Sequence, residues 1–208
     1  MGILQYLRLR TYEEELRFLI IKLAPLLAGK KPSVLLCLRN KEDNKTKQNF
    51  SFFSYYSKEI KEKLGVSACE LRTGKNSALV LFYSQNLLYE AIMHGKERNF
   101  LYKNGYRNCC SIDENLCILK KKFNKEKIPH EIGLFLGYPY KDVIGFVEKK
   151  ERSQPVKKGL WKVYGNAEVS LNLMNSYKSC MNIAKKMVAN ASVYIILAQV
   201  QRQWMRHL

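Results

Sequence analysis

His130 and Glu131 are adjacent side chains of the types that acid–base catalysis uses. Their chemical interest lies in the histidine, because an imidazole titrates near neutral pH. A zinc protease motif would need a second histidine at position 134, where this chain has Leu134. Pro129 at a helix start and Glu131 in the first helical turn explain the same residues structurally. We therefore treat the pair as candidate ligand-binding residues and assign no catalytic residue.

Six cysteines are the other reactive side chains, at positions 37, 69, 109, 110, 117 and 180. None forms a Cys-x-x-Cys pair and the chain has only three histidines, so no metal site is predicted. Without a secretory signal the thiols are expected to be reduced. Cys109 and Cys110 are adjacent, and adjacent cysteines bond to each other only with strain. An enzyme that uses Cys109, Cys110 or His130 stays open as a third interpretation.

The net charge of +18, from 36 basic and 18 acidic side chains, is the extreme value of the composition. A charge of this size attracts nucleic acid, an anionic small molecule or an acidic protein. The basic belt, residues 120–162, holds 12 Lys or Arg against 5 Asp or Glu and has aromatic residues among them. Aromatic rings beside cations suit base stacking with phosphate contact, which makes an RNA- or DNA-binding module the alternative function. Its candidate contacts are Lys120, Lys121, Lys122, Lys149, Lys150 and Arg152.

Residues 129–139 contain two prolines and two glycines around a Leu-Phe-Leu run. Pro139 disfavours a helical backbone at Tyr138, and Gly137 permits conformations that a Cβ forbids, so we expect a sharp corner. Our leading hypothesis is a ligand-binding or accessory protein whose site lies where this corner meets a strand at 160–164. Close backbone approach, helix starts and nearby lysines favour an anionic ligand there, although the cofactor is unknown. The candidate site residues are His130, Glu131, Gly137, Tyr138, Trp161 and Tyr164.

Hydrophobic periodicity predicts the elements that position these residues. Thr11 and Glu14 have the spacing of a capping box that begins a helix, and Asn166 is placed to cap a long final helix through Met187. Other helices are predicted over 50–64, 85–94, 96–103, 113–124, 132–136 and 141–148. Strands are predicted over 33–38, 69–72, 78–83 and 160–164, with a hairpin turn at 73–76.

This order of helices and strands predicts one α/β domain, with α+β as the other option, over residues 1–187. Its sheet should be small and mixed, with three to four strands packed by several helices. Residues 188–208 are an apolar and then basic tail of uncertain structure. The longest apolar runs, 16–28 and 188–200, are too short or interrupted for a membrane span, and we expect a cytoplasmic protein.

Several short motifs occur in an order that is typical of one family. They are Ala24 to Pro32, Leu79 to Tyr83, Gly105-Tyr106, Pro129 to Pro139, Asp142 to Phe146 and Trp161-Lys162-Val163-Tyr164. Over about residues 10–180 the chain resembles the bacterial family called domain of unknown function 3793, found mainly in clostridia and related anaerobes. The resemblance implies a cytoplasmic protein of an anaerobe and brings no established activity.

Three positions, in two places of the chain, depart from that family's pattern. A cysteine often precedes the glycine before the Trp-Lys-Val-Tyr motif, and this chain has Lys158 there. A His-Cys pair often precedes Ala24, and this chain has Lys22 and Leu23. Cys180 does match the usual position. These departures weaken a thiol or metal mechanism for this chain.

Overall fold

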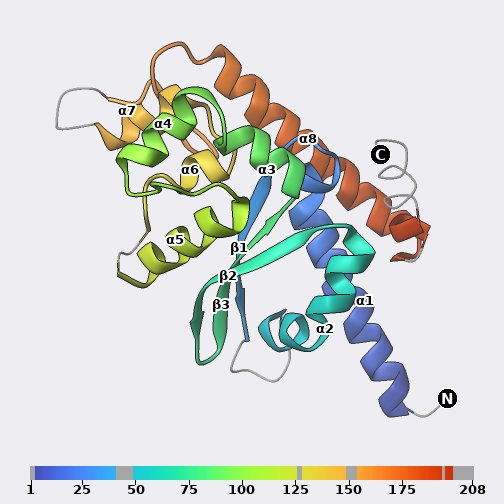
Figure 1. Cartoon of the computed structure of the whole chain (residues 1–208). Helices are drawn as coiled ribbons and strands as arrows, with labels where there is room; N and C mark the ends of the chain where they lie inside the picture. Colours follow the sequence, from blue (N-terminus) through green and yellow to red (C-terminus); the bar gives the residue numbers. More distant parts are fainter. Residues whose placement is uncertain (1–2, 41–48, 126–127, 149–153, 194, 199–208) are drawn as a thin grey trace.

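The central element of the fold is a three-stranded antiparallel sheet with the order β1-β3-β2. The strands are β1 (Ser33–Arg39), β2 (Ser67–Gly74) and β3 (Ser77–Tyr83). The computed structural model describes residues 3–40, 49–125, 128–148, 154–193 and 195–198 (Figure 1). Both outer strands pair with β3, and Tyr83 lies opposite a serine of each one. Gly74 pairs with Ser77, so the predicted hairpin turn is confirmed.

The side chains of β3 divide the interior into two cores. Successive residues of a strand point to opposite faces of its sheet. Ala78, Val80 and Phe82 therefore pack in the first core, whereas Leu81 and Tyr83 pack in the second core. The nearly continuous apolar run of this strand is explained by burial on both faces.

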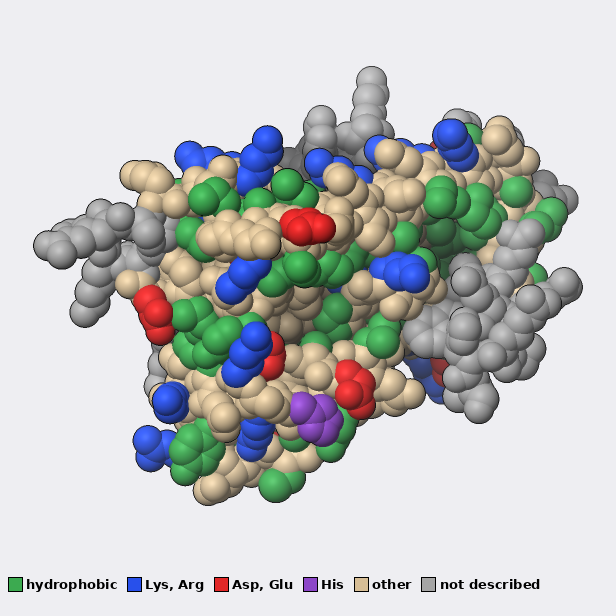
Figure 2. All heavy atoms as spheres, turned by 90° about the horizontal axis from the view of Figure 1, so that it is seen from above, with side chains coloured by type: hydrophobic (Ala, Val, Ile, Leu, Met, Phe, Trp, Pro, Cys, Tyr) green, Lys and Arg blue, Asp and Glu red, His purple; other side chains and the backbone are tan. Residues whose placement is uncertain are grey.

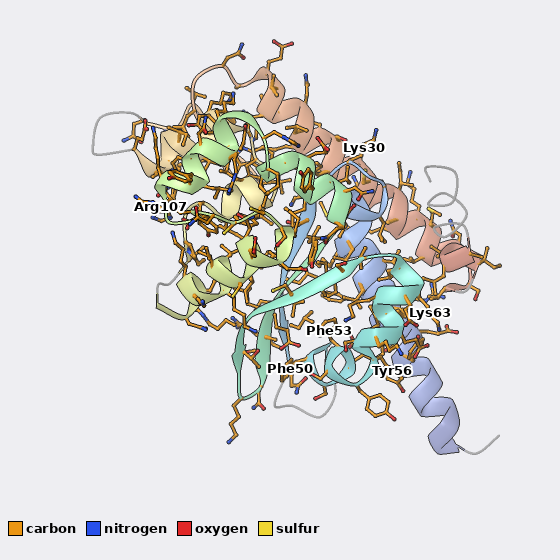
Figure 3. The ribbon with its side chains drawn as sticks, in the orientation of Figure 1. Lys30, Phe50, Phe53, Tyr56, Lys63 and Arg107 are labelled. Atoms are coloured by element: carbon orange, nitrogen blue, oxygen red, sulfur yellow. The ribbon has the colours of Figure 1, made fainter. Side chains whose placement is uncertain are left out.

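The first core is covered by long helices. They are α1 (Ile3–Leu27), α2 (Asn49–Leu64) and α8 (Glu168–Asn190), and α1 packs along α8 (Figure 1). Phe53 projects from α2 toward the sheet, and its ring meets that of Phe82 with centroids 5.3 Å apart (Figure 3). Val193, Ile196 and Leu197, beyond α8, are also buried in this core.

The second core lies on the other face of the sheet, under a set of shorter helices. They are α3 (Gln85–Ile92), α4 (Gly95–Lys103), α5 (Ile112–Lys125), α6 (Ile132–Phe135) and α7 (Tyr140–Val147). Of these, α5 packs on β2. A separate two-stranded hairpin, β4 (Lys157–Lys158) and β5 (Lys162–Val163), follows α7 and contacts it.

The predicted fold class, a single mixed α/β domain with a small sheet, is confirmed. The prediction that this sheet is mixed is wrong: β3 pairs antiparallel with both β1 and β2, and the short turn between β2 and β3 does not allow a parallel pairing of those two strands. No helix in the described ranges is long and apolar enough to cross a membrane.

Two local predictions differ from the structure. The first helix begins at Ile3, so Thr11 lies inside α1 and does not cap it; residues 3–10 contain no Pro or Gly, and the helix continues through them. The strand predicted over 160–164 is reduced to β5, which pairs with β4 rather than with the sheet. Asn166 does accept the N–H of Glu168 at 2.9 Å, at the start of α8.

Candidate ligand-binding pocket

A pocket of about 380 Å³ lies between the 128–133 segment, α7 and the β4–β5 hairpin. Most of its walls are apolar or aromatic. Its lining residues are Ile128, His130, Ile132, Gly133, Tyr138, Asp142, Val143, Phe146, Trp161 and Lys162. This volume and this composition are typical of small-molecule sites in proteins.

Tyr138 and Trp161 form one wall of the pocket as a stacked pair. Their ring centroids are 4.4 Å apart and their planes differ by 20°. The corner that presents Tyr138 depends on Gly137, which has a φ of +70°. A Cβ on this glycine would lie 2.5 Å from Cδ of Pro32, at the entry to β1. The predicted corner therefore joins the pocket wall to the sheet by a close contact that only glycine permits.

The ammonium of Lys31 packs beside this wall without lining the pocket. It lies 5.6 Å from the ring centroid of Tyr138 and 5.2 Å from that of Tyr177. Burial lowers the pKa of Lys31 to about 8. Its contact with the two rings ties the segment between α1 and β1 to the aromatic wall.

Asp142 connects α7, the hairpin and α8 through one buried carboxylate. Its Oδ2 accepts hydrogen bonds from Trp161 Nε1 at 2.7 Å and from Ser170 Oγ at 2.6 Å. Its Oδ1 accepts from the backbone N–H of Tyr164 at 2.9 Å and from Lys141 Nζ at 2.7 Å. The residue is only 2% exposed. Four donors, one on α7 itself and three from the hairpin and α8, therefore converge on a carboxylate that is almost fully buried.

The protonation of Asp142 follows from these contacts. Burial acts to raise the pKa of the carboxyl, but the hydrogen bonds from Lys141, Ser170, Tyr164 and Trp161 together hold it below its ordinary value. Asp142 is therefore ionised at neutral pH. Because its oxygens are already occupied by four donors, it serves as the anchor of the pocket wall and not as a general base.

Two basic side chains share the ring of Phe146 at the mouth of the pocket. The ring centroids of His130 and Phe146 are 5.0 Å apart with an edge-to-face angle of 82°. Lys162 Nζ lies 5.3 Å from the same Phe146 centroid. Phe146 itself is 41% exposed. The pocket thus combines an apolar interior with a lysine and a histidine at its rim.

The structure brings three of the six candidate ligand-binding residues into this pocket: His130, Tyr138 and Trp161. The other three have packing positions. Glu131 is buried and accepts hydrogen bonds from Tyr106 Oη and from Lys122 Nζ. Gly137 packs on Pro32, and Tyr164 is buried against Gly145 of α7.

Asp142, Phe146 and Lys162 are lining residues that sequence reasoning did not select. Asp142 could have been found from its neighbours, because apolar residues follow it in α7. A carboxylate buried among such residues needs protein donors, since an isolated buried charge is costly. No local pattern indicates that Phe146 and Lys162 meet, since they belong to different elements.

The basic belt is only partly available for nucleic acid. Lys120 and Lys121 are exposed on α5, but Lys122 is paired with the buried Glu131. On the face shown in Figure 2, Lys and Arg side chains are scattered among apolar and acidic ones. The remaining predicted contacts, Lys149, Lys150 and Arg152, lie outside the described residues.

The adjacent cysteines differ from each other. Cys109 is buried and Cys110 is exposed, and both are free thiols. Burial raises the pKa of the Cys109 thiol, which opposes the thiolate form that a nucleophile needs. Within the described residues, no group of three or more His, Cys, Asp or Glu side chains is placed to hold a metal ion.

Comparison with known proteins supports one assignment. The family described as a protein of unknown function, DUF3793, matches residues 19–197. No curated protein and no solved structure matches the chain. Since the family match spans the sheet, the pocket and the helices from the last part of α1 onward, this protein belongs to the DUF3793 family.

Proposed function

We propose that this protein binds a small molecule with an apolar, ring-sized body and an anionic end. The body would lie in the pocket of about 380 Å³, against Val143, Phe146 and the Tyr138–Trp161 stack. The anionic end would lie at the mouth, beside Lys162 and His130. A net charge of +18 adds a long-range attraction for such a ligand.

The observation that carries the proposal is the position of both basic side chains on one ring at the pocket mouth. Phe146 is in contact with His130 and Lys162, and all three line the pocket. An apolar ligand alone would need no cation there. Within the described pocket lining the other charged group, Asp142, is already satisfied by protein donors, so the charge offered to a ligand is positive.

Nucleic-acid binding has weaker support as the primary function. Among the described residues, its best candidate contacts are two exposed lysines of α5, while a third lysine is paired with Glu131. Catalysis by the Cys109 thiol is opposed by its burial. Binding of an anionic small molecule uses the features that the structure brings together.

The test is isothermal titration calorimetry with 1-naphthoate, a carboxylate on a two-ring apolar body, at pH 7.5. We expect Phe146→Ala to weaken the affinity about tenfold, because it removes the apolar surface that the body covers and the ring that both His130 and Lys162 contact. Thermal melting should show a change in stability of less than about 1 kcal/mol, since the ring is partly exposed.

Tyr89→Ala is the matched control. Tyr89 is also 41% exposed, and its ring meets that of His94 edge to face at 5.3 Å, on α3 and outside the pocket lining. This variant should bind 1-naphthoate like the unmodified protein. Equal affinities in all three proteins, or no binding in any of them, would remove the proposal.

A further inference from the structure

The β4–β5 hairpin places two lysines directly opposite each other. Lys158 of β4 is the cross-strand partner of Lys162, whereas Lys157 is the partner of the buried Val163. Directly opposite side chains of an antiparallel pair share one face and lie about 5 Å apart at Cβ, where like charges are destabilising. Within the described residues neither ammonium has a carboxylate partner. The pair is an unbalanced positive charge at a defined place.

One member of this pair is part of the pocket. Lys162 lines the pocket and lies over Phe146. Lys158 is not a lining residue, but as the cross-strand partner of Lys162 it projects from the same face of the hairpin and adds a positive charge next to the lining on the side of β4. The neighbouring Lys157 projects from the opposite face.

The hairpin is held in this arrangement by contacts on both sides of β5. Asp142 accepts hydrogen bonds from Trp161 before the strand and from Tyr164 after it. Lys141 donates to the carbonyl of Tyr164 at 3.0 Å. These contacts fix the backbone of β5, and the pairing with β4 keeps both lysines on one face of the hairpin. The two positive charges are therefore offered to an anion from neighbouring backbone positions.

We propose that the anionic end of the ligand is a phosphate monoester, held between Lys158 and Lys162. This inference rests on the proposed function of the pocket. A phosphate monoester carries a charge of about −1.5 to −2 at pH 7 and has three acceptor oxygens, so it can pair with both lysines at once. A carboxylate carries one charge and balances only one of them. The ligand class is thus an organic phosphate whose apolar, ring-sized part enters the pocket.

The experiment compares three titrants at pH 7.5 by isothermal titration calorimetry: 1-naphthyl phosphate, 1-naphthoate and inorganic phosphate. The unmodified protein should bind 1-naphthyl phosphate about tenfold more tightly than 1-naphthoate, as one additional charge pair predicts. In Lys158→Gln this preference should fall to about twofold, with the affinity for 1-naphthoate nearly unchanged.

Lys157→Gln is the matched control, because it removes the same charge from the same strand on the other face of the hairpin. It should keep the preference for 1-naphthyl phosphate. Circular dichroism of Lys157→Gln and Lys158→Gln checks that each variant is folded.

The outcomes separate the two proposals. Binding of 1-naphthoate that is sensitive to Phe146→Ala, together with equal affinity for 1-naphthyl phosphate, overturns the phosphate inference and leaves the pocket proposal standing. A loss of preference in Lys157→Gln as large as in Lys158→Gln also overturns it, because the effect would be general electrostatics. Failure of both naphthyl compounds to bind overturns both. Inorganic phosphate that binds as tightly as 1-naphthyl phosphate would show that the apolar pocket takes no part.

Discussion

The two sides of the sheet are built in different ways. The first core is covered by long helices, of which α1 has 25 residues and α8 has 23. The second core is covered by short ones, and α6 has only 4 residues. The pocket lies on the second side, where Ile132 and Val143 belong both to the core and to the pocket wall.

This difference has a physical origin. A long helix satisfies most of its backbone groups internally and needs only an apolar stripe to be held. A helix of one or two turns leaves most of its terminal N–H and C=O groups without internal partners, so other contacts must hold it. On the second side those contacts are buried carboxylates: Glu131 before α6 and Asp142 in α7. Polar anchoring of short segments is what shapes the walls of the pocket.

The largest effect should come from the first core. Phe82→Ala removes a ring that is 0% exposed and in contact with Phe53, and we expect a loss of about 3–5 kcal/mol in the free energy of unfolding. Urea denaturation followed by circular dichroism measures it. Tyr55→Ala, at an exposed ring of α2, should change stability by less than about 0.5 kcal/mol. A loss below about 1 kcal/mol for Phe82→Ala would contradict the close packing of this ring in the first core.

An intermediate effect is expected from the polar anchor of the second side. Asp142→Asn keeps the shape but loses the charge that four donors share, at a cost of about 2 kcal/mol near pH 7. Glu148→Gln, an exposed carboxylate at the end of the same helix, is the control and should cost little. A loss of less than about 0.5 kcal/mol in the free energy of unfolding of Asp142→Asn would show that the polar anchor is dispensable. The contrast between the two sides of the sheet would then not hold.

The same variant has a pH signature. The pKa of Asp142 in the folded protein lies below its ordinary value of 3.8, so its stabilising effect is present above that value. The effect is lost as pH falls through the folded pKa, because protonation favours the unfolded state. The difference in unfolding free energy between the unmodified protein and Asp142→Asn should therefore be constant from neutral pH to about pH 5 and shrink below about pH 4. Urea midpoints at each pH measure this, and a difference that grows on acidification contradicts it.

Much of the fold follows from local patterns in the sequence. The apolar run from Ala78 to Tyr83 predicts a strand, and this strand is the central one of the sheet. Gly137 and Pro139 predict the corner that presents Tyr138. These features depend on neighbours in the chain, and backbone sterics and hydrophobic periodicity are sufficient to find them.

The site depends on contacts that such patterns do not contain. Asp142 meets a donor 28 residues away on α8, and Tyr138 stacks on a ring beyond the end of α7. Tyr164 was a candidate site residue because its motif is aromatic and basic, yet it packs under α7. Only the tertiary arrangement decides which aromatic residue of the motif faces the pocket, since residues on one short strand point to opposite sides.

The smallest expected effect tests how closely α7 and the hairpin approach each other. A Cβ on Gly145 would lie 2.7 Å from Cβ and Cγ of Tyr164, which cannot move without shifting the residue that Asp142 holds. Overpacking costs about 1–3 kcal/mol, and the better helix propensity of alanine offsets up to about 1 kcal/mol of it, so Gly145→Ala should lose about 1 kcal/mol net.

Gly159→Ala provides the matched control in the hairpin itself. Its Cβ would meet the sulfur of Met174 at 2.5 Å, but this is near the end of a flexible side chain that can turn away. We expect a loss of less than about 0.5 kcal/mol in urea denaturation. If Gly145→Ala were as well tolerated as Gly159→Ala, the hairpin would be free to shift relative to α7. The fixed position of Lys162 at the pocket mouth would then lose its structural basis.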